Sequence, residues 1–337
     1  MTRTRRLLPL FALPAVSALA LAGCASGADA DASGADTDAI TVVASTDVYA
    51  DIAQQVAGDA VEVSAIITSS AQDPHDFEPS AQDQLTVSRA DLIIENGGGY
   101  DSFIDALIDS SGAGAHVITA SEFSHDYPGA EEHSDDETEG EHSDEHAEDE
   151  HAEDEHAGHD HIEGFNEHVW YDPHTMAHVA EAIAEELAEL LPDEAATFEA
   201  NAEAFAAEIE TIEEALAEVD AAHGGARIFV TEPVSVYLAA AAGLDNVTPE
   251  AFSEAVEEGQ DVPPATLLEA LDLLSSGEVA LVIANTQTGG AETTQVLDAA
   301  EADGIPVIEF SETLPEGQTY ISWMLENVEA ISAALTE

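Results

Sequence analysis

The chain is short of cysteine and of basic residues, and each shortage excludes a class of chemistry. Cys24 is the only cysteine, so no intramolecular disulfide can form and no site can be built from several thiolates. Any metal site must therefore use His, Asp and Glu. Only five residues are basic, all of them arginine, against 72 Asp and Glu. So acidic a surface repels nucleic acid and anionic lipid headgroups, and it attracts cations.

The first residues have the layout of a secretory signal. Three arginines within the first six residues precede an apolar run ending in small residues, which predicts a signal peptide over residues 1–23 rather than a spanning helix. The last letters, LAGC, resemble a bacterial lipobox, in which Cys24 would carry lipid and anchor the protein outside the cytoplasm. The alternative is a non-lipidated signal that happens to contain a cysteine. Loss of the segment, with its three arginines and no acid, would take the formal charge from −67 to −70.

Beyond a tether rich in Ala, Ser, Gly and Asp at residues 24–39, strand and helix patterns alternate. Short apolar, largely β-branched runs predict strands, and segments with helical spacing follow most of them. The predicted strands are ITVVAS, VEVSAII, LIIE and HVIT in the first half, and RIFVT, VALVIA and IPVIEF in the second. Such short alternating units favour parallel sheets with helices on both faces. The sequence therefore predicts two α/β domains.

One helical pattern is longer than the others. Residues 193–222 contain no Gly or Pro, and their larger apolar residues recur at spacings of three, four and seven. A helix of roughly 30 residues would be about 45 Å long, enough to bridge two domains. We therefore expect a stiff linking helix rather than a flexible linker.

Two short motifs carry candidate chemistry. DPHDFEP, residues 73–79, follows a predicted strand, where open α/β sheets place their ligands. In NEHVWYDP, His168 precedes an Asp-Pro pair, in which Asp172 is better interpreted as a helix N-cap than as a metal ligand. Each motif alone is weak, because a lone His in a loop is more often a surface residue than a ligand.

A stretch rich in His and acid separates these motifs. Its HAEDE segments begin at residues 146 and 151, five residues apart. A five-residue step turns a helix by about 500°, so the histidines would form no single stripe, and neighbouring like charges disfavour a helix. We expect a disordered loop over residues 125–163. It is either a solvated insertion with no task or a weak multi-site trap for a cation, with imidazole as the selecting ligand. Its histidines are His125, His133, His142, His146, His151, His156, His159 and His161.

The motifs together resemble a known family. In order they are DPHxxEP, the His-rich acidic loop, HVWxDP, the long helix and a closing TYxxWMxxN helix. From residue 40 onward the chain resembles the zinc- and manganese-binding solute-binding lipoproteins of bacterial ABC metal importers. The resemblance implies two Rossmann-like lobes with parallel sheets, joined by one long rigid helix, with the metal in the cleft between them. It also implies a monomer that delivers a divalent metal ion to a membrane permease.

The predicted organisation combines these observations. It is a signal peptide at 1–23, a tether at 24–39, an N-terminal lobe at 40–124, the His-rich loop at 125–163, the end of the N-terminal lobe at 164–192, the linking helix at 193–222 and a C-terminal lobe at 223–337. Carried over from the family, the metal ligands fall on His75, His168, Glu232 and Glu312, with Glu309 as an alternative to Glu312.

The identity of the ion stays open between two metals. The family associates a carboxylate at the third position, here Glu232, with manganese, and it associates His-rich loops with zinc. The Irving–Williams order also lets zinc bind such a site more tightly than manganese. We expect Zn²⁺, with Mn²⁺ as the alternative.

Two other classes of protein compete with the importer reading. A metallohydrolase would use Glu232 or Glu312 as a general base, but no HExxH helix and no nucleophile elbow is present, so we expect no enzyme. A surface metal buffer or adhesin would bind metal mainly with the His-rich loop. The remaining histidines, which we expect to be surface or structural residues, are His116, His174, His178 and His223.

Overall fold

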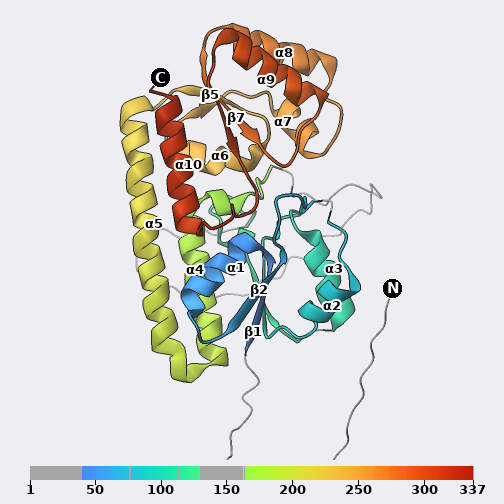
Figure 1. Cartoon of the computed structure of the whole chain (residues 1–337), viewed down its shortest axis with the longest axis vertical. Helices are drawn as coiled ribbons and strands as arrows, with labels where there is room; N and C mark the ends of the chain where they lie inside the picture. The colour runs from blue at the N-terminus through green and yellow to red at the C-terminus, as the bar shows by residue number, and fades with distance from the viewer. Residues whose placement is uncertain (1–39, 76, 113, 130–161, 163, 337) are drawn as a thin grey trace, which may run out of the picture. The chain divides into compact units, whose positions relative to one another are not determined.

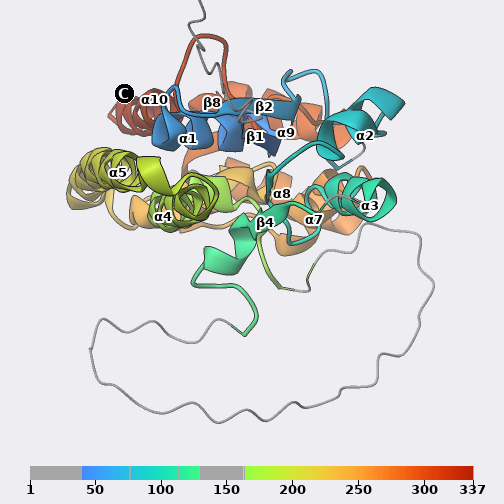
Figure 2. The same cartoon turned by 90° about the horizontal axis from the view of Figure 1, so that it is seen from below.

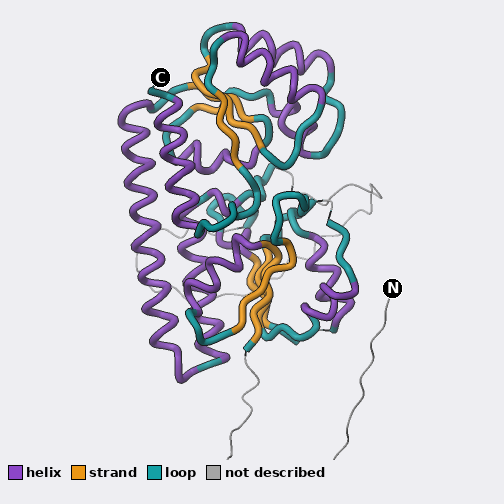
Figure 3. Tube along the Cα trace, in the orientation of Figure 1, coloured by secondary structure: helices purple, strands orange, loops and turns teal. Residues whose placement is uncertain are grey.

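The computed structural model describes residues 40–75, 77–112, 114–129, 162 and 164–336. They contain two four-stranded parallel sheets, which Figure 3 shows as separate groups of strands. The first sheet, in the N lobe, has the order β2-β1-β3-β4, with β1 (Thr41–Thr46), β2 (Glu62–Ile67), β3 (Leu92–Glu95) and β4 (His116–Thr119). The second sheet, in the C lobe, has the order β6-β5-β7-β8, with β5 (Arg227–Val230), β6 (Asp245–Asn246), β7 (Val279–Asn285) and β8 (Val307–Phe310). The predicted α/β class is confirmed.

Helices cover both faces of each sheet (Figure 1). The N lobe contains α1 (Asp47–Ala57), α2 (Ala81–Val87), α3 (Ser102–Ser111) and α4 (Pro173–Leu190). The C lobe contains α6 (Val236–Ala241), α7 (Glu250–Glu257), α8 (Pro264–Ser275), α9 (Ala291–Asp303) and α10 (Tyr320–Ala334). Neither α7 nor the two-residue strand β6 was predicted from the sequence. No helix in the described part of the chain is both long and apolar enough to cross a bilayer.

The layers follow from the alternation of side chains along each strand. In β1, Val42 and Ala44 face a core shared with α1 and α4, whereas Val43 faces the core under α2 and α3. In β5, Ile228 faces the larger core and Phe229 faces the core under α7 and α8. Both faces are apolar because strands of parallel sheets are buried on both sides.

The long helix predicted for residues 193–222 is α5 (Ala195–His223). It packs beside α4, as Figures 1 and 2 both show, and contacts α1 of the N lobe and α6 and α10 of the C lobe. Its buried residues recur at helical spacing and belong to one core cluster that includes strands of both sheets. The two lobes are therefore joined by a continuous hydrophobic core, which supports the predicted rigid linker.

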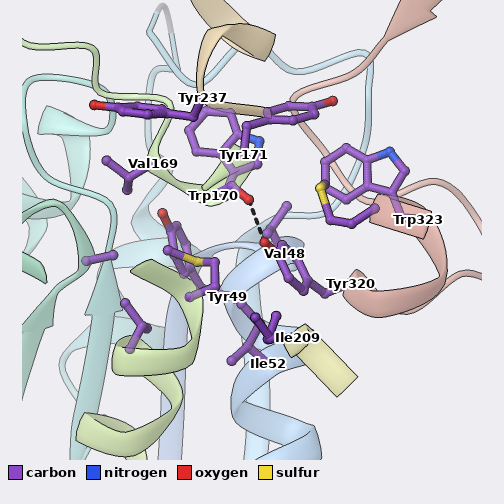
Figure 4. Packing of buried hydrophobic residues seen from close by; sticks show 14 of the residues in the cluster. Val48, Tyr49, Ile52, Val169, Trp170, Tyr171, Ile209, Tyr237, Tyr320 and Trp323 are labelled. Atoms are coloured by element: carbon purple, nitrogen blue, oxygen red, sulfur yellow. Dashed lines mark hydrogen bonds between the residues drawn. The ribbon is translucent and has the colours of Figure 1, made fainter. Parts of the chain in front are cut away.

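Aromatic residues form the middle of this shared core. Trp170 and Trp323 are both buried. Figure 4 shows Trp170 above Tyr49 and Tyr320, and the Tyr320 hydroxyl donates a 2.8 Å hydrogen bond to the Trp170 carbonyl. Because the buried hydroxyl is satisfied, the ring contributes its full apolar area to the core. This bond ties the start of α10 to the segment that carries His168.

Asp172 has the capping role predicted for it. Its side chain accepts hydrogen bonds from the His174 backbone N–H at 3.2 Å and from the Thr175 hydroxyl at 2.6 Å. Pro173 is the first residue of α4, where its missing N–H costs nothing. The cap fixes the start of α4 a few residues after His168.

Candidate metal centre

The candidate site lies where strands of both sheets end. His75 is in the loop after β2 and Tyr100 follows β3 in the N lobe. In the C lobe, Asn285 is the last residue of β7 and Glu312 follows β8. Ligands of open parallel sheets bind at the carboxyl ends of the strands. Here two such ends contribute to one site.

Three of the four predicted ligands converge. One donor atom from each of His75, His168 and Glu312 lies within 4.8 Å of the other two. His168 and Glu312 are each 1% exposed. Since ligands sit about 2.0–2.2 Å from Zn²⁺, donor atoms around one ion are separated by roughly 3–4 Å, so a small contraction would close the trio on an ion.

The orientation of His168 is set by Asn166. The Asn166 side-chain oxygen lies 2.8 Å from His168 Nδ1 and accepts the His168 backbone N–H at 3.2 Å. The Asn166 amide nitrogen donates to the Pro233 carbonyl at 3.0 Å, which fixes which end of the amide faces the imidazole. Nδ1 is therefore the protonated nitrogen, and Nε2 is left as the metal-binding atom.

Rings pack tightly around the two imidazoles. Tyr100 meets His75 edge to face at 4.9 Å and His168 at 5.7 Å, measured between ring centroids. Trp170 lies 4.5 Å from Tyr100 and 5.1 Å from His168 by the same measure. This packing limits the rotamers of both histidines, so the N lobe presents its imidazoles already oriented.

The turn that leads from β3 to Tyr100 requires a glycine. At Gly97, where φ is +72°, a Cβ would lie 2.3 Å from the Thr119 side chain, so any other residue would clash. The preceding Asn96 donates from its side chain to the Glu167 carbonyl at 2.9 Å. The turn thereby holds the backbone beside His168 against the end of β3.

The C lobe holds its carboxylates by hydrogen bonds. The Asn285 amide nitrogen donates to Glu232 at 2.9 Å and to Glu312 at 2.6 Å. The Thr288 hydroxyl donates to the other oxygen of Glu232, and the Tyr100 hydroxyl donates to Glu312 at 3.1 Å. Glu232 therefore lies beside the trio, linked to it through Asn285.

Glu309, the alternative to Glu312, points elsewhere. It lies on β8 and is exposed, and together with Glu316 and Glu326 it lines a cavity that none of the three converging ligands lines. Glu312, two residues past the end of the strand, is the glutamate that reaches the histidines. The geometry thus favours Glu312.

The pKa values of the two C-lobe carboxylates are raised. Burial, together with the charges of Asp73 and Glu232, raises the pKa of Glu312 to about 8 despite the hydrogen bonds from Asn285 and Tyr100. Burial likewise raises the pKa of Glu232, which the bonds from Thr288 and Asn285 partly offset. Buried carboxylates ionise readily only beside a cation, and a divalent metal ion would supply that charge.

Several residues of the site were not found from the sequence. Asn285, Thr288 and Tyr100 hold the carboxylates, and Glu257 and Glu167 approach the histidines from another side. Burial, with the charges of Glu167, Glu232 and Glu312, raises the pKa of Glu257 to about 9. The ends of parallel strands were a signal for Asn285, whereas Glu257 ends a helix that was not predicted.

The other predicted residues are placed as follows. His125 is exposed and lies 3.6 Å from Asp172. His174 and His178 are exposed on α4, as expected, each 3.4 Å from a glutamate oxygen. His116, expected to be structural, lies exposed on β4 and pairs with Glu186 on α4. Cys24 and the remaining histidines of the loop lie outside the described residues: His133, His142, His146, His151, His156, His159 and His161.

Comparison with known proteins shows the family to which the chain belongs. The chain is 26% identical over 325 residues to the zinc-binding lipoprotein AdcA of Streptococcus pneumoniae, covering 95% of this chain but 59% of AdcA. It is 24% identical over 327 residues to the manganese-binding lipoprotein MntA of Halalkalibacterium halodurans, covering 96% of each. The solved structure of the periplasmic zinc binding protein TroA from Treponema pallidum shares the fold, with a TM-score of 0.68 at 18% identity, covering 88% of this chain and 99% of TroA. Residues 42–334 match the family model described as zinc-uptake complex component A, periplasmic, and the chain therefore belongs to that family.

Proposed function

We propose that the protein is the extracytoplasmic metal-binding subunit of an ABC importer. It captures a divalent transition-metal ion, zinc in the first place, and delivers it to a membrane permease. The observation that carries the proposal is the convergence of His75, His168 and Glu312 at a buried site made by both lobes. The zinc- and manganese-binding lipoproteins to which the chain is similar support the same role.

The proposed ligands are two imidazoles and two carboxylates. The N lobe supplies His75 and His168, and the C lobe supplies Glu312 together with Glu232, which Asn285 holds beside it. An ion bound by all four ties the lobes together across the cleft. Since α5 and the shared core connect the lobes, closure over the ion requires only small movements.

The choice between zinc and manganese follows from the donor set. Two nitrogens and two oxygens suit tetrahedral Zn²⁺, and Zn²⁺ binds such sites more tightly than Mn²⁺. Manganese is the alternative because Glu232 makes the site richer in oxygen than one with a third imidazole would be. We place zinc first.

The segments outside the described residues complete the proposal. Residues 1–23 would be removed as a signal peptide, Cys24 would carry lipid, and residues 24–39 would tether the lobes to the cell membrane. The His-rich loop would act as an accessory trap that raises the local metal concentration. The working form would be a monomer with a permease partner.

The proposal assigns no catalytic residue. A hydrolase would need Glu232 or Glu312 as a free general base, but each accepts a hydrogen bond from Asn285. Four side-chain ligands around one ion would also leave no coordinated water to activate. Binding and delivery are therefore the function that this arrangement supports.

Calorimetric titration of the purified full chain with Zn²⁺ and, in parallel, Mn²⁺ tests the proposal. We expect one tight zinc site that is lost in His75→Ala and kept in the control His174→Ala, whose side chain is exposed on α4. Tight zinc binding that survives His75→Ala would show that the His-rich loop, not the cleft, binds the metal. Selective tight binding of Mn²⁺ would move the cargo assignment to manganese.

A further inference from the structure

Two carboxylates near the histidines have no role in the proposed site. Glu257 is the last residue of α7, and Glu167 directly precedes His168. One donor atom from each of His75, Glu167 and Glu257 lies within 4.8 Å of the other two. The described residues thus contain a second group that can hold a metal, and it shares only His75 with the first.

Glu257 of the second group approaches His168 from the side of its Nδ1 atom. A Glu257 carboxylate oxygen is 3.7 Å from His168 Nδ1, the nitrogen that faces Asn166, whereas the proposed ligand atom of His168 is Nε2. That oxygen is shielded from solvent and accepts no hydrogen bond from any described residue. Glu312, by contrast, accepts hydrogen bonds from Asn285 and Tyr100. This oxygen of Glu257 lies close to the site without a hydrogen-bond donor among the described residues.

Solvent reaches His75 and Glu257 of this group through a cavity, whereas Glu167 is 3% exposed and does not line it. A cavity of about 380 Å³ is lined by His75 and Glu257, whereas His168 and Glu312 are not among its lining residues. The exposed residues Glu258 and Asp261 form part of its wall, so it opens to the outside. A cation entering the cavity meets His75 and Glu257 on the solvent side of the buried trio.

We propose that His75, Glu167 and Glu257 form an outer position for the same divalent transition-metal ion, occupied in alternation with the inner position at His75, His168 and Glu312. One imidazole and two carboxylates neutralise a divalent ion and suit Zn²⁺ or Mn²⁺. The positions alternate because they share His75. This inference rests on the proposed function, since it concerns the route by which the same cargo reaches the site.

A double-mutant cycle in the full chain tests the outer position with Zn²⁺ as the probe. Glu312→Gln weakens the inner position, so the remaining binding depends on Glu257. In that background, Glu257→Gln should lower the zinc affinity by a further factor of about 10 or more, against about threefold in the wild-type background. The matched control is Glu254→Gln, an exposed glutamate one turn earlier on α7, which should have no effect in either background.

X-ray absorption at the zinc edge supplies a readout that a merely structural role would not change. The inner position has two imidazoles and the outer position has one, so the imidazole count should fall from two in the wild type to one in Glu312→Gln. Equal effects of Glu257→Gln in both backgrounds, or two imidazoles retained in Glu312→Gln, would overturn the outer position. If the wild type lacks a tight site altogether, the proposed function fails and not this inference alone.

Discussion

The two lobes hold their halves of the proposed metal site in different ways. The N lobe orients two imidazoles by ring packing against Tyr100 and Trp170. The C lobe holds two carboxylates through shared hydrogen bonds from Asn285. Packing does not depend on charge, whereas the carboxylate network contains acids whose pKa values are raised by burial. The N lobe is therefore the preorganised half of the site, and the C lobe is the half that responds to protons and to the cation.

The largest effect should come from the preorganised half. Removal of an imidazole by His168→Ala should lower zinc affinity by more than about 100-fold, because losses outside the coordination sphere already cost 10–100-fold. Titration with a competing chelator measures this loss. His178→Ala, which removes an exposed imidazole from α4, is the control. A loss of less than tenfold for His168→Ala would show that the imidazole is not a ligand.

A smaller effect should follow from loosening the carboxylate half. Asn285→Ala removes the one amide that bonds both Glu232 and Glu312, and zinc affinity should fall by about 10–100-fold. The variant keeps both carboxylates and loses only the hydrogen bonds that position them. Asn246→Ala changes an exposed asparagine of β6 in the same lobe and serves as control. Unchanged zinc affinity in Asn285→Ala would mean that the carboxylates need no positioning.

We also expect the C lobe to make stability and metal affinity depend on pH. Because the pKa of Glu312 rises from an ordinary 4.5 to about 8, the folded metal-free protein binds more protons than the unfolded chain between these values. Its free energy of unfolding from this group therefore falls as pH rises from about 5 to 8, while metal affinity rises by up to tenfold per pH unit for each proton displaced. Melting temperatures with a chelator and with zinc, at pH 5.5, 7 and 8.5, measure both trends.

Glu312→Gln isolates this contribution. The variant cannot ionise at residue 312, so the metal-free melting temperature should fall less between pH 5.5 and 8.5 than in the wild type. Identical pH profiles for the two proteins would show that Glu312 is ionised throughout and that the C lobe does not respond to protons through it.

The smallest effect should arise where the two halves touch. Tyr100→Phe keeps the ring that packs on both histidines and removes only the hydroxyl that bonds Glu312. A hydrogen bond to a charged group contributes about 1.5–3 kcal/mol, and part of it is replaced by water, so zinc affinity should fall by about tenfold or less. Tyr127→Phe, in a tyrosine that packs on Phe165, is the control. A loss as large as that of His168→Ala would mean that the ring itself had moved.

Local patterns were enough to predict most of the fold. The strands with continuous apolar runs and the helix α5 were predicted from periodicity, because burial on both faces or along one face leaves a regular spacing. The strand β6 has only two residues, too few to show any period. Helix α7 has just two buried residues, Phe252 and Val256, so its apolar face was too short to recognise.

The residues of the candidate site likewise differ in whether the sequence could predict them. His75 and His168 stand in motifs that the family resemblance identifies, and the structure brings them together with Glu312. Asn285 lies at the end of a predicted strand, but an asparagine there has many possible partners. Glu257 reaches the histidines only because the C lobe packs against the N lobe at this point, a tertiary contact that leaves no local pattern.

X-ray absorption of wild-type protein with one equivalent of zinc tests the division between the lobes most directly. The N lobe's two histidines and the C lobe's two glutamates predict two imidazole nitrogens at about 2.0–2.1 Å and oxygen ligands for the rest of the sphere. Three or four imidazoles would contradict the account, because additional imidazoles would have to come from the His-rich loop.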